Sequence, residues 1–164
     1  MTKSRDTADI NSGTNTAVGE DALESNTASS NTAVGYGAGY SNTTGGQVAA
    51  FGSNALMDNT TGDYNTALGF WALTNNTTAN SNTGVGHTAL SANTTGAFNT
   101  AVGHQALQSN TTAGNNTAVG YQAGYTQTTG HTNTNVGIKA GYGTTTGIDN
   151  TYICLLYTSP SPRD

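Results

Sequence analysis

Apolar and polar residues follow one recurring phrase along this chain, close to NTAVG-x-x-AL-x-x-NTTG. The phrase restarts at Asn15, Asn31, Val48, Asn65, Asn82, Asn99, Asn116, Asn133 and Asn150. Successive restarts are 17 residues apart, except that the first interval is one residue shorter. Such a period is typical of a solenoid, in which each repeat is one turn and equivalent residues form columns. We therefore expect an all-β parallel solenoid, or β-roll, of about eight turns over residues 15–153, preceded by a lead-in over residues 1–14.

Within each turn the pattern predicts two short strands, one around Thr-Ala-Val and one around Ala-Leu. Glycine and Asn-Thr-Thr segments are expected to form the corners, because Asn and Gly tolerate left-handed backbone and Asn and Thr side chains bond nearby backbone groups. Helix is excluded, since no window keeps a period of 3.6 and strong helix formers are scarce. Strands of successive turns then pair in parallel about 4.8 Å apart, and the stack spans roughly 40 Å.

Three columns are the candidates for structural roles. The fourth position is apolar in every turn and is expected to be the core column. The fifth is glycine, which indicates a sharp bend or a close approach of another backbone, and the eighth is alanine, which indicates tight packing. In the middle of the chain these columns are Val34, Leu68, Val85, Val102, Val119 and Val136; Gly69, Gly86, Gly103 and Gly120; and Ala72, Ala89, Ala106 and Ala123.

The ninth position alternates between leucine and glycine. Wherever it is glycine the next residue is tyrosine, as in Gly39-Tyr40, Gly124-Tyr125 and Gly141-Tyr142. We expect the tyrosine ring to fill the space that the leucine leaves.

A single turn offers roughly one valine, one leucine and two alanines for burial, so one chain encloses a thin core. A second source of apolar burial is expected from parallel association of identical chains. We predict a homotrimer, with the glycine and alanine columns at the contact.

The phrase NTAVG followed by an alanine three positions later, as in Asn116 to Ala123, resembles the repeat of the YadA-like heads of trimeric autotransporter adhesins. The same phrase with NTTG is similar to repeats of bacteriophage tail fibre proteins. The resemblance covers about residues 15–153, and it implies a left-handed parallel β-roll with three chains side by side, used for attachment. The unit here is longer than that of the adhesin heads, with the extra residues in the Asn-Thr-Thr corner.

Charged residues make up only 8% of the chain, and between Glu24 and Lys139 the only ones are Asp58 and Asp63. This distribution offers no basic stripe for nucleic acid and no cationic face for anionic lipid, so neither partner is expected. No stretch approaches the roughly 20 apolar residues of a membrane span. The first residues, MTKSRDTADINSG, lack the apolar segment of a secretory signal.

Two groups of residues invite a metal-binding interpretation. His87 and His104 share the sixth position of adjacent turns, so their rings are expected to stack, but two imidazoles without a third ligand make a poor site. Glu20, Asp21 and Glu24 form the sole acidic cluster without the spacing of a calcium loop. A charged first turn that protects the open edge of the solenoid is the alternative. We expect no metal and no cofactor.

No nucleophile, base and orienting acid recur at a workable spacing along the chain, so we expect no enzymatic activity. The GxG sequences reflect the period and not a phosphate-binding loop.

Four aromatic residues are candidate surface contacts. Trp71 occupies the seventh position, which is otherwise polar or small, and it follows Phe70. Tyr64 and Phe98 share the seventeenth position two turns apart. Each is a candidate to stack on a sugar or to anchor a receptor, and the competing interpretation for each is a contact between subunits.

These features predict a structural and adhesive segment of a trimeric fibre, from a phage tail fibre or a bacterial surface adhesin. Its location would be the virion or the cell surface, and its partner a carbohydrate or protein receptor of the host. The alternative is an ice-binding, threonine-rich solenoid. Against it, the corner threonines come as adjacent pairs, and neighbours in a strand point to opposite sides.

The last eleven residues, CLLYTSPSPRD, break the repeat after Ile153. They resemble the translation of an adapter used in sequencing libraries, so residues 154–164 are expected to be foreign and the chain truncated. A natural irregular tail is the alternative. In adhesins or fibre proteins a membrane anchor or a self-cleaving chaperone domain would follow.

Overall fold

Nine short strands, one in each repeat, form the regular structure of this protein. The computed structural model describes residues 14–153, so most of the predicted lead-in and the predicted foreign segment lie outside the described residues. The strands are β1 (Thr16–Val18), β2 (Thr32–Val34), β3 (Ala49–Phe51), β4 (Thr66–Leu68), β5 (Thr83–Val85), β6 (Thr100–Val102), β7 (Thr117–Val119), β8 (Thr134–Val136) and β9 (Thr151–Ile153).

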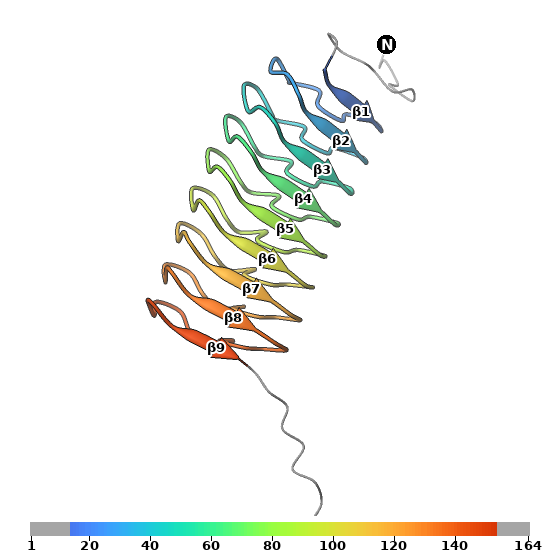
Figure 1. The fold of residues 1–164 in the computed structure, drawn as a ribbon. Helices are drawn as coiled ribbons and strands as arrows, with labels where there is room; N and C mark the ends of the chain where they lie inside the picture. The colour runs from blue at the N-terminus through green and yellow to red at the C-terminus, as the bar shows by residue number, and fades with distance from the viewer. Residues whose placement is uncertain (1–13, 154–164) are drawn as a thin grey trace, which may run out of the picture.

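All nine strands belong to one parallel sheet whose order is the order of the sequence. Equivalent residues pair in register, for example Ala101 of β6 with Ala118 of β7. Figure 1 shows the strands stacked along one side of the molecule, each followed by a loop that returns to the next strand. The predicted all-β parallel solenoid of about eight turns is confirmed.

Strands β1 to β8 bury their central residue and direct the two flanking residues outward, whereas the central residue of β9, Tyr152, is half-buried. Ala67 of β4 is fully buried, whereas Leu68 is half exposed. Side chains alternate across a strand, so positions two and four face one side and position three the other. The prediction that the fourth position is the core column is therefore wrong for the single chain: Val34 and Val85 are half-buried, and the exposed members are Leu68, Val102, Val119 and Val136.

The fourth position faces outward because the interior of the coil is too narrow for its side chains. The leucine at position nine of one turn lies against position three of the next, and a Cβ placed at Gly84 would lie 3.2 Å from Cγ of Leu73. An alanine methyl fills this space and a valine exceeds it. The core therefore consists of alanines at positions three and eight and leucines at position nine, among them Leu56, Leu73, Leu90 and Leu107, together with Val48 at position one.

The Ala-Leu segment is a turn and not the predicted second strand. The residues at positions seven and nine have positive φ angles, for example 57° at Trp71 and 51° at Leu73. The alanine between them, Ala72, donates its backbone N–H to the Gly69 carbonyl oxygen at 3.2 Å. Two left-handed residues so close together bend the chain, which excludes an extended strand.

The glycines at position five stack backbone on backbone, as predicted. Their φ angles lie between 118° and 139°, a region that favours glycine. A Cβ at Gly35 would lie 2.7 Å from the carbonyl carbon of Gly52 in the next turn. The alanines Ala72, Ala89, Ala106 and Ala123 are fully buried within the coil. The alanine column is thus used inside one chain and is not free for the predicted subunit contact, whereas the glycines of position five are only partly buried.

The tyrosines that follow a glycine at position nine do not fill the space of the missing leucine. Tyr40 and Tyr142 are exposed. The leucine of the preceding turn occupies the space instead, since a Cβ at Gly39 would lie 2.9 Å from Cδ2 of Leu23 and one at Gly124 would lie 2.8 Å from Cδ2 of Leu107. The prediction that the tyrosine ring fills the space of the missing leucine in its own turn is wrong. The leucine of the preceding turn fills that space.

Two columns of buried asparagines bind the turns together. At position one, Oδ1 of each asparagine accepts the backbone N–H of the next restart residue, as between Asn99 and Asn116 at 3.0 Å. At the corner, Nδ2 of Asn93 donates to Oδ1 of Asn76 at 2.9 Å and to the Gly96 carbonyl oxygen at 2.9 Å. These amides satisfy backbone groups that a corner would otherwise bury unpaired.

Candidate functional site

The outer face of the sheet carries two columns along the whole coil. Position two holds threonine in every strand except β3, where Ala49 takes its place, and position four holds an apolar residue in all nine. The nine apolar residues are Val18, Val34, Phe51, Leu68, Val85, Val102, Val119, Val136 and Ile153. We call these two columns the strand face. The strand face is therefore a continuous apolar strip on a surface with few charges.

A row of stacked rings lies beside the strand face at position six. Phe70 stacks on His87 with ring centroids 5.4 Å apart, His87 on His104 at 5.0 Å, and His104 on Tyr121 at 5.4 Å. The predicted stacking of the two histidines is present. Each ring is exposed, so the row is a flat aromatic edge that runs across four turns.

Trp71 extends this row onto the neighbouring side of the coil. Its ring stacks on Phe70 with centroids 5.3 Å apart and planes 8° from parallel. Both side chains are 45% exposed. The structure therefore brings these two predicted surface residues together on the exposed surface of the coil.

A groove of about 300 Å³ opens next to Trp71. Residues at positions seven and ten of four successive turns line most of it: Met57, Trp71, Thr74, Thr88, Ser91 and Gln108. Asn75 completes the lining. We call this the tryptophan groove. No strand residue contributes to it.

At both ends of the tryptophan groove, position ten is occupied by a bulkier residue. Position ten is Tyr40 in the turn before Met57, and Tyr125 and Tyr142 in the turns after Gln108. Tyr125 and Tyr142 stack with centroids 5.1 Å apart, and Nζ of Lys139 lies 5.4 Å from the centroid of Tyr142. The groove was not predicted from the sequence, although the alternation of Leu with Gly-Tyr at positions nine and ten signals where it is open.

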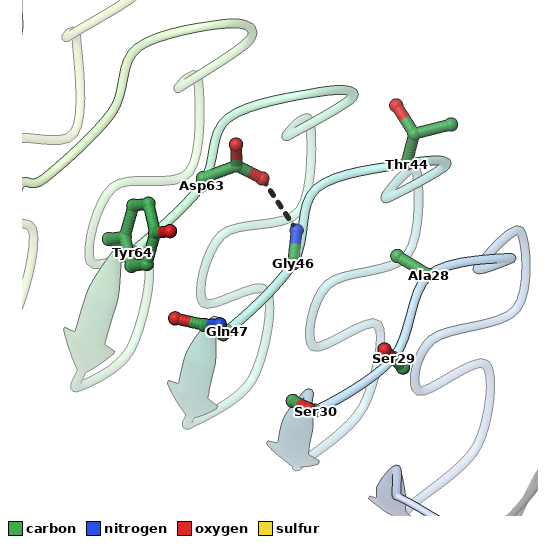
Figure 2. A pocket seen from close by; sticks show the side chains of 8 residues that line it. All are labelled: Ala28, Ser29, Ser30, Thr44, Gly46, Gln47, Asp63 and Tyr64. Carbon is green, nitrogen blue, oxygen red and sulfur yellow. Dashed lines mark hydrogen bonds between the residues drawn. The ribbon is translucent and has the colours of Figure 1, made fainter.

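A second groove, of about 290 Å³, lies at the corners of the first three turns. Figure 2 shows Tyr64 and Gln47 near the starts of their strands and Thr44 further out along the corner. The backbone N–H of Gly46 donates to Oδ1 of Asp63 at 2.8 Å (Figure 2). This groove begins at Ala28, Ser29 and Ser30, in the turn that is one residue shorter than the others.

Tyr64 and Phe98 are among the most exposed aromatic residues, at 59% and 63%. Both have positive φ angles, 60° and 61°, which turn their side chains outward at the corner. The turn that contains Ser81 lies between them, so the structure does not bring the two rings together.

Residues 14–153 contain no group of three or more His, Cys, Asp or Glu side chains that could hold a metal ion. Glu20, Asp21 and Glu24 lie in the first turn after β1. Within the same range, no helix is long and apolar enough to cross a membrane.

These features define a repeat protein of the parallel β-solenoid class, with an apolar strand face and two lateral grooves. No family model, curated protein or solved structure matches the chain.

Proposed function

We propose that this solenoid is a structural and adhesive segment of a homotrimeric fibre, of the kind found in phage tail fibres and bacterial surface adhesins. The observation that carries the proposal is the apolar column of the strand face. A valine or larger apolar residue stands outward in all nine strands, and burying such a column against two copies of itself supplies the apolar burial that the alanine-rich interior lacks.

Register favours identical chains as the partner. The strand face repeats at the strand spacing of about 4.8 Å, so a parallel copy presents an apolar residue at every level. Low charge also favours close contact, because no like charges of the strand face have to be brought together. The NTAVG and NTTG phrases, which resemble those of adhesin heads and tail fibres, agree with a trimer on the virion or cell surface.

Sedimentation equilibrium of the purified chain tests the trimer. We expect three times the monomer mass for the parent chain and a shift toward monomer for Val102→Asp, which places a charge in the middle of the strand face. The matched control is Thr95→Asp at an exposed corner, which should remain trimeric. Circular dichroism checks that each variant is folded. A parent chain that sediments as a monomer would refute the proposal.

The same face favours one second candidate, ice binding. The threonines of position two and the apolar residues of position four form two regular ranks on a parallel sheet, and such a flat, repetitive face is suited to ordering water. This use requires a free face, so it excludes the trimer. Thermal hysteresis in a monomeric preparation, lost in Thr100→Leu, would support ice binding over the fibre.

A further inference from the structure

The tryptophan groove differs from the rest of the surface in combining a rigid aromatic platform with neutral polar groups. Its platform, Trp71, is the only tryptophan of the chain. The Phe70 ring packs parallel to the indole, and the backbone N–H of Trp71 donates to the Ser53 carbonyl oxygen at 3.1 Å. A ring fixed in this way loses little conformational freedom when a ligand binds.

The groove walls supply hydrogen-bonding groups at several levels of the coil. Thr74, Thr88 and Ser91 contribute hydroxyl groups, and Asn75 and Gln108 contribute amides. The Oε1 atom of Gln108 is buried and has no hydrogen-bond partner. A buried acceptor without a partner is costly, so a ligand that donates a hydrogen bond to it gains affinity.

No charged side chain lines the groove, which argues against an anionic or cationic ligand. A ligand that matches an aromatic face on one side and hydroxyl and amide groups on the other has an apolar face and many hydroxyls of its own. We infer that the tryptophan groove binds a neutral saccharide, with one sugar ring stacked on Trp71 and its hydroxyls bonded to Ser91 and Gln108. The volume of about 300 Å³ is at the small end of ligand pockets.

This inference deepens the proposed function, since it assigns the attachment role to one groove and one class of receptor. The groove contains no strand residue, so association through the strand face leaves it accessible. In a trimer the groove is repeated three times, and weak individual sites then gain avidity on a surface covered with the same glycan.

The test begins with the full chain on an array of maltohexaose, cellohexaose, chitohexaose and neutral blood-group glycans. Sialylated glycans and heparin serve as anionic probes. We expect binding to neutral glycans only. The strongest of them is then titrated in solution while the emission of Trp71 is followed, which reports on the groove alone because the chain has a single tryptophan.

Two variants act on the groove in different ways. Trp71→Ala removes the platform, and Ser91→Tyr fills the groove with the residue found at position ten in the turns of Tyr125 and Tyr142. Each should weaken binding about tenfold or more. The matched control is Phe98→Ala, which removes an exposed aromatic residue outside the groove and should leave affinity within about twofold.

The inference would be overturned by no binding to any neutral glycan, by binding to anionic glycans only, or by binding that survives both Trp71→Ala and Ser91→Tyr. A loss of trimer in Trp71→Ala would assign the tryptophan to a subunit contact and would also overturn it. Sedimentation of the parent chain is scored separately. A monomer that still binds the glycan would refute the fibre and leave the saccharide site standing.

Discussion

Gln127 stands one turn beyond Asn110 in the column of corner asparagines, and the Oδ1 atom of Asn110 is buried without a hydrogen-bond partner. In the earlier turns the same oxygen accepts from Nδ2 of the next asparagine, as Asn93 accepts from Asn110 at 2.8 Å. Gln127 instead donates to the Gly130 carbonyl oxygen at 2.7 Å. Its longer side chain keeps the bond to its own corner and loses the bond between turns.

Replacing Gln127 by asparagine should therefore extend the column by one bond. Corner asparagines make both bonds, so the contact with Gly130 is retained and Asn110 gains a donor, in exchange for the long 3.5 Å bond that Oε1 of Gln127 accepts from Nδ2 of Asn135. We expect the free energy of unfolding to rise by about 1 kcal/mol, measured by thermal or chemical denaturation. A variant less stable than the parent would show that the column does not tolerate another asparagine at this level.

Cutting the same column in its middle should have a larger effect. Asn93→Ala removes two donated bonds and the acceptor used by Asn110, and leaves buried amide atoms of its neighbours unpaired. We expect a loss of about 3 kcal/mol in the free energy of unfolding. Asn75→Ala, at an exposed position, is the control, with a change within about 0.5 kcal/mol. Equal effects of the two substitutions would argue against the column.

The stacked glycines predict an equally sharp contrast. Gly86 has a φ of 133°, and a Cβ there would lie 2.5 Å from the carbonyl oxygen of Gly103. The Gly103 carbonyl belongs to the backbone and cannot move aside unless the turns separate. Gly86→Ala should therefore lower the free energy of unfolding by about 3 kcal/mol or more, through backbone strain and separation of the turns. Gly143→Ala is the matched control, since nothing lies within 4 Å of its Cβ position. Denaturation of both variants would reveal the difference, and a stable Gly86→Ala would contradict this packing.

Position seventeen offers a route to stabilisation. Thr132 has a φ of 60°, which is unfavourable for a β-branched residue. Thr132→Asn should relieve about 1 kcal/mol of strain, because asparagine tolerates the left-handed region. Thr129→Asn makes the same chemical change at an exposed residue whose φ angle is not positive. The melting temperature of this variant should not rise. A gain in both variants would assign the effect to composition and not to backbone strain.

The sequence period was sufficient to predict the parallel solenoid and the stacked histidines and glycines, because stacking follows from repetition alone. It could not predict which face of the strand points inward. Alternation places Ala67 and Leu68 on opposite faces, and hydrophobicity favours the leucine as the buried one. The choice is made by volume, since Leu73 of the same turn already occupies the interior under the next strand.

The turns between strands were less predictable for a related reason. Leucine is not a residue that favours positive φ, yet Leu73 and Leu90 adopt it at 51° and 53°. Burial of their side chains against the next turn outweighs the local preference. The tryptophan groove depends on the same geometry, because the direction of residues seven and ten is set by these left-handed positions.

Coupling between folding and association gives the last prediction. If the strand face is buried in a trimer, the midpoint of thermal unfolding should rise with protein concentration, because association stabilises only the folded chains. Over a roughly hundredfold range of concentration, the parent chain should show this rise and Val102→Asp should not. Differential scanning calorimetry measures both. A midpoint independent of concentration in the parent chain would mean that one chain is stable by itself, with alanine and asparagine columns alone sufficient to hold the turns together.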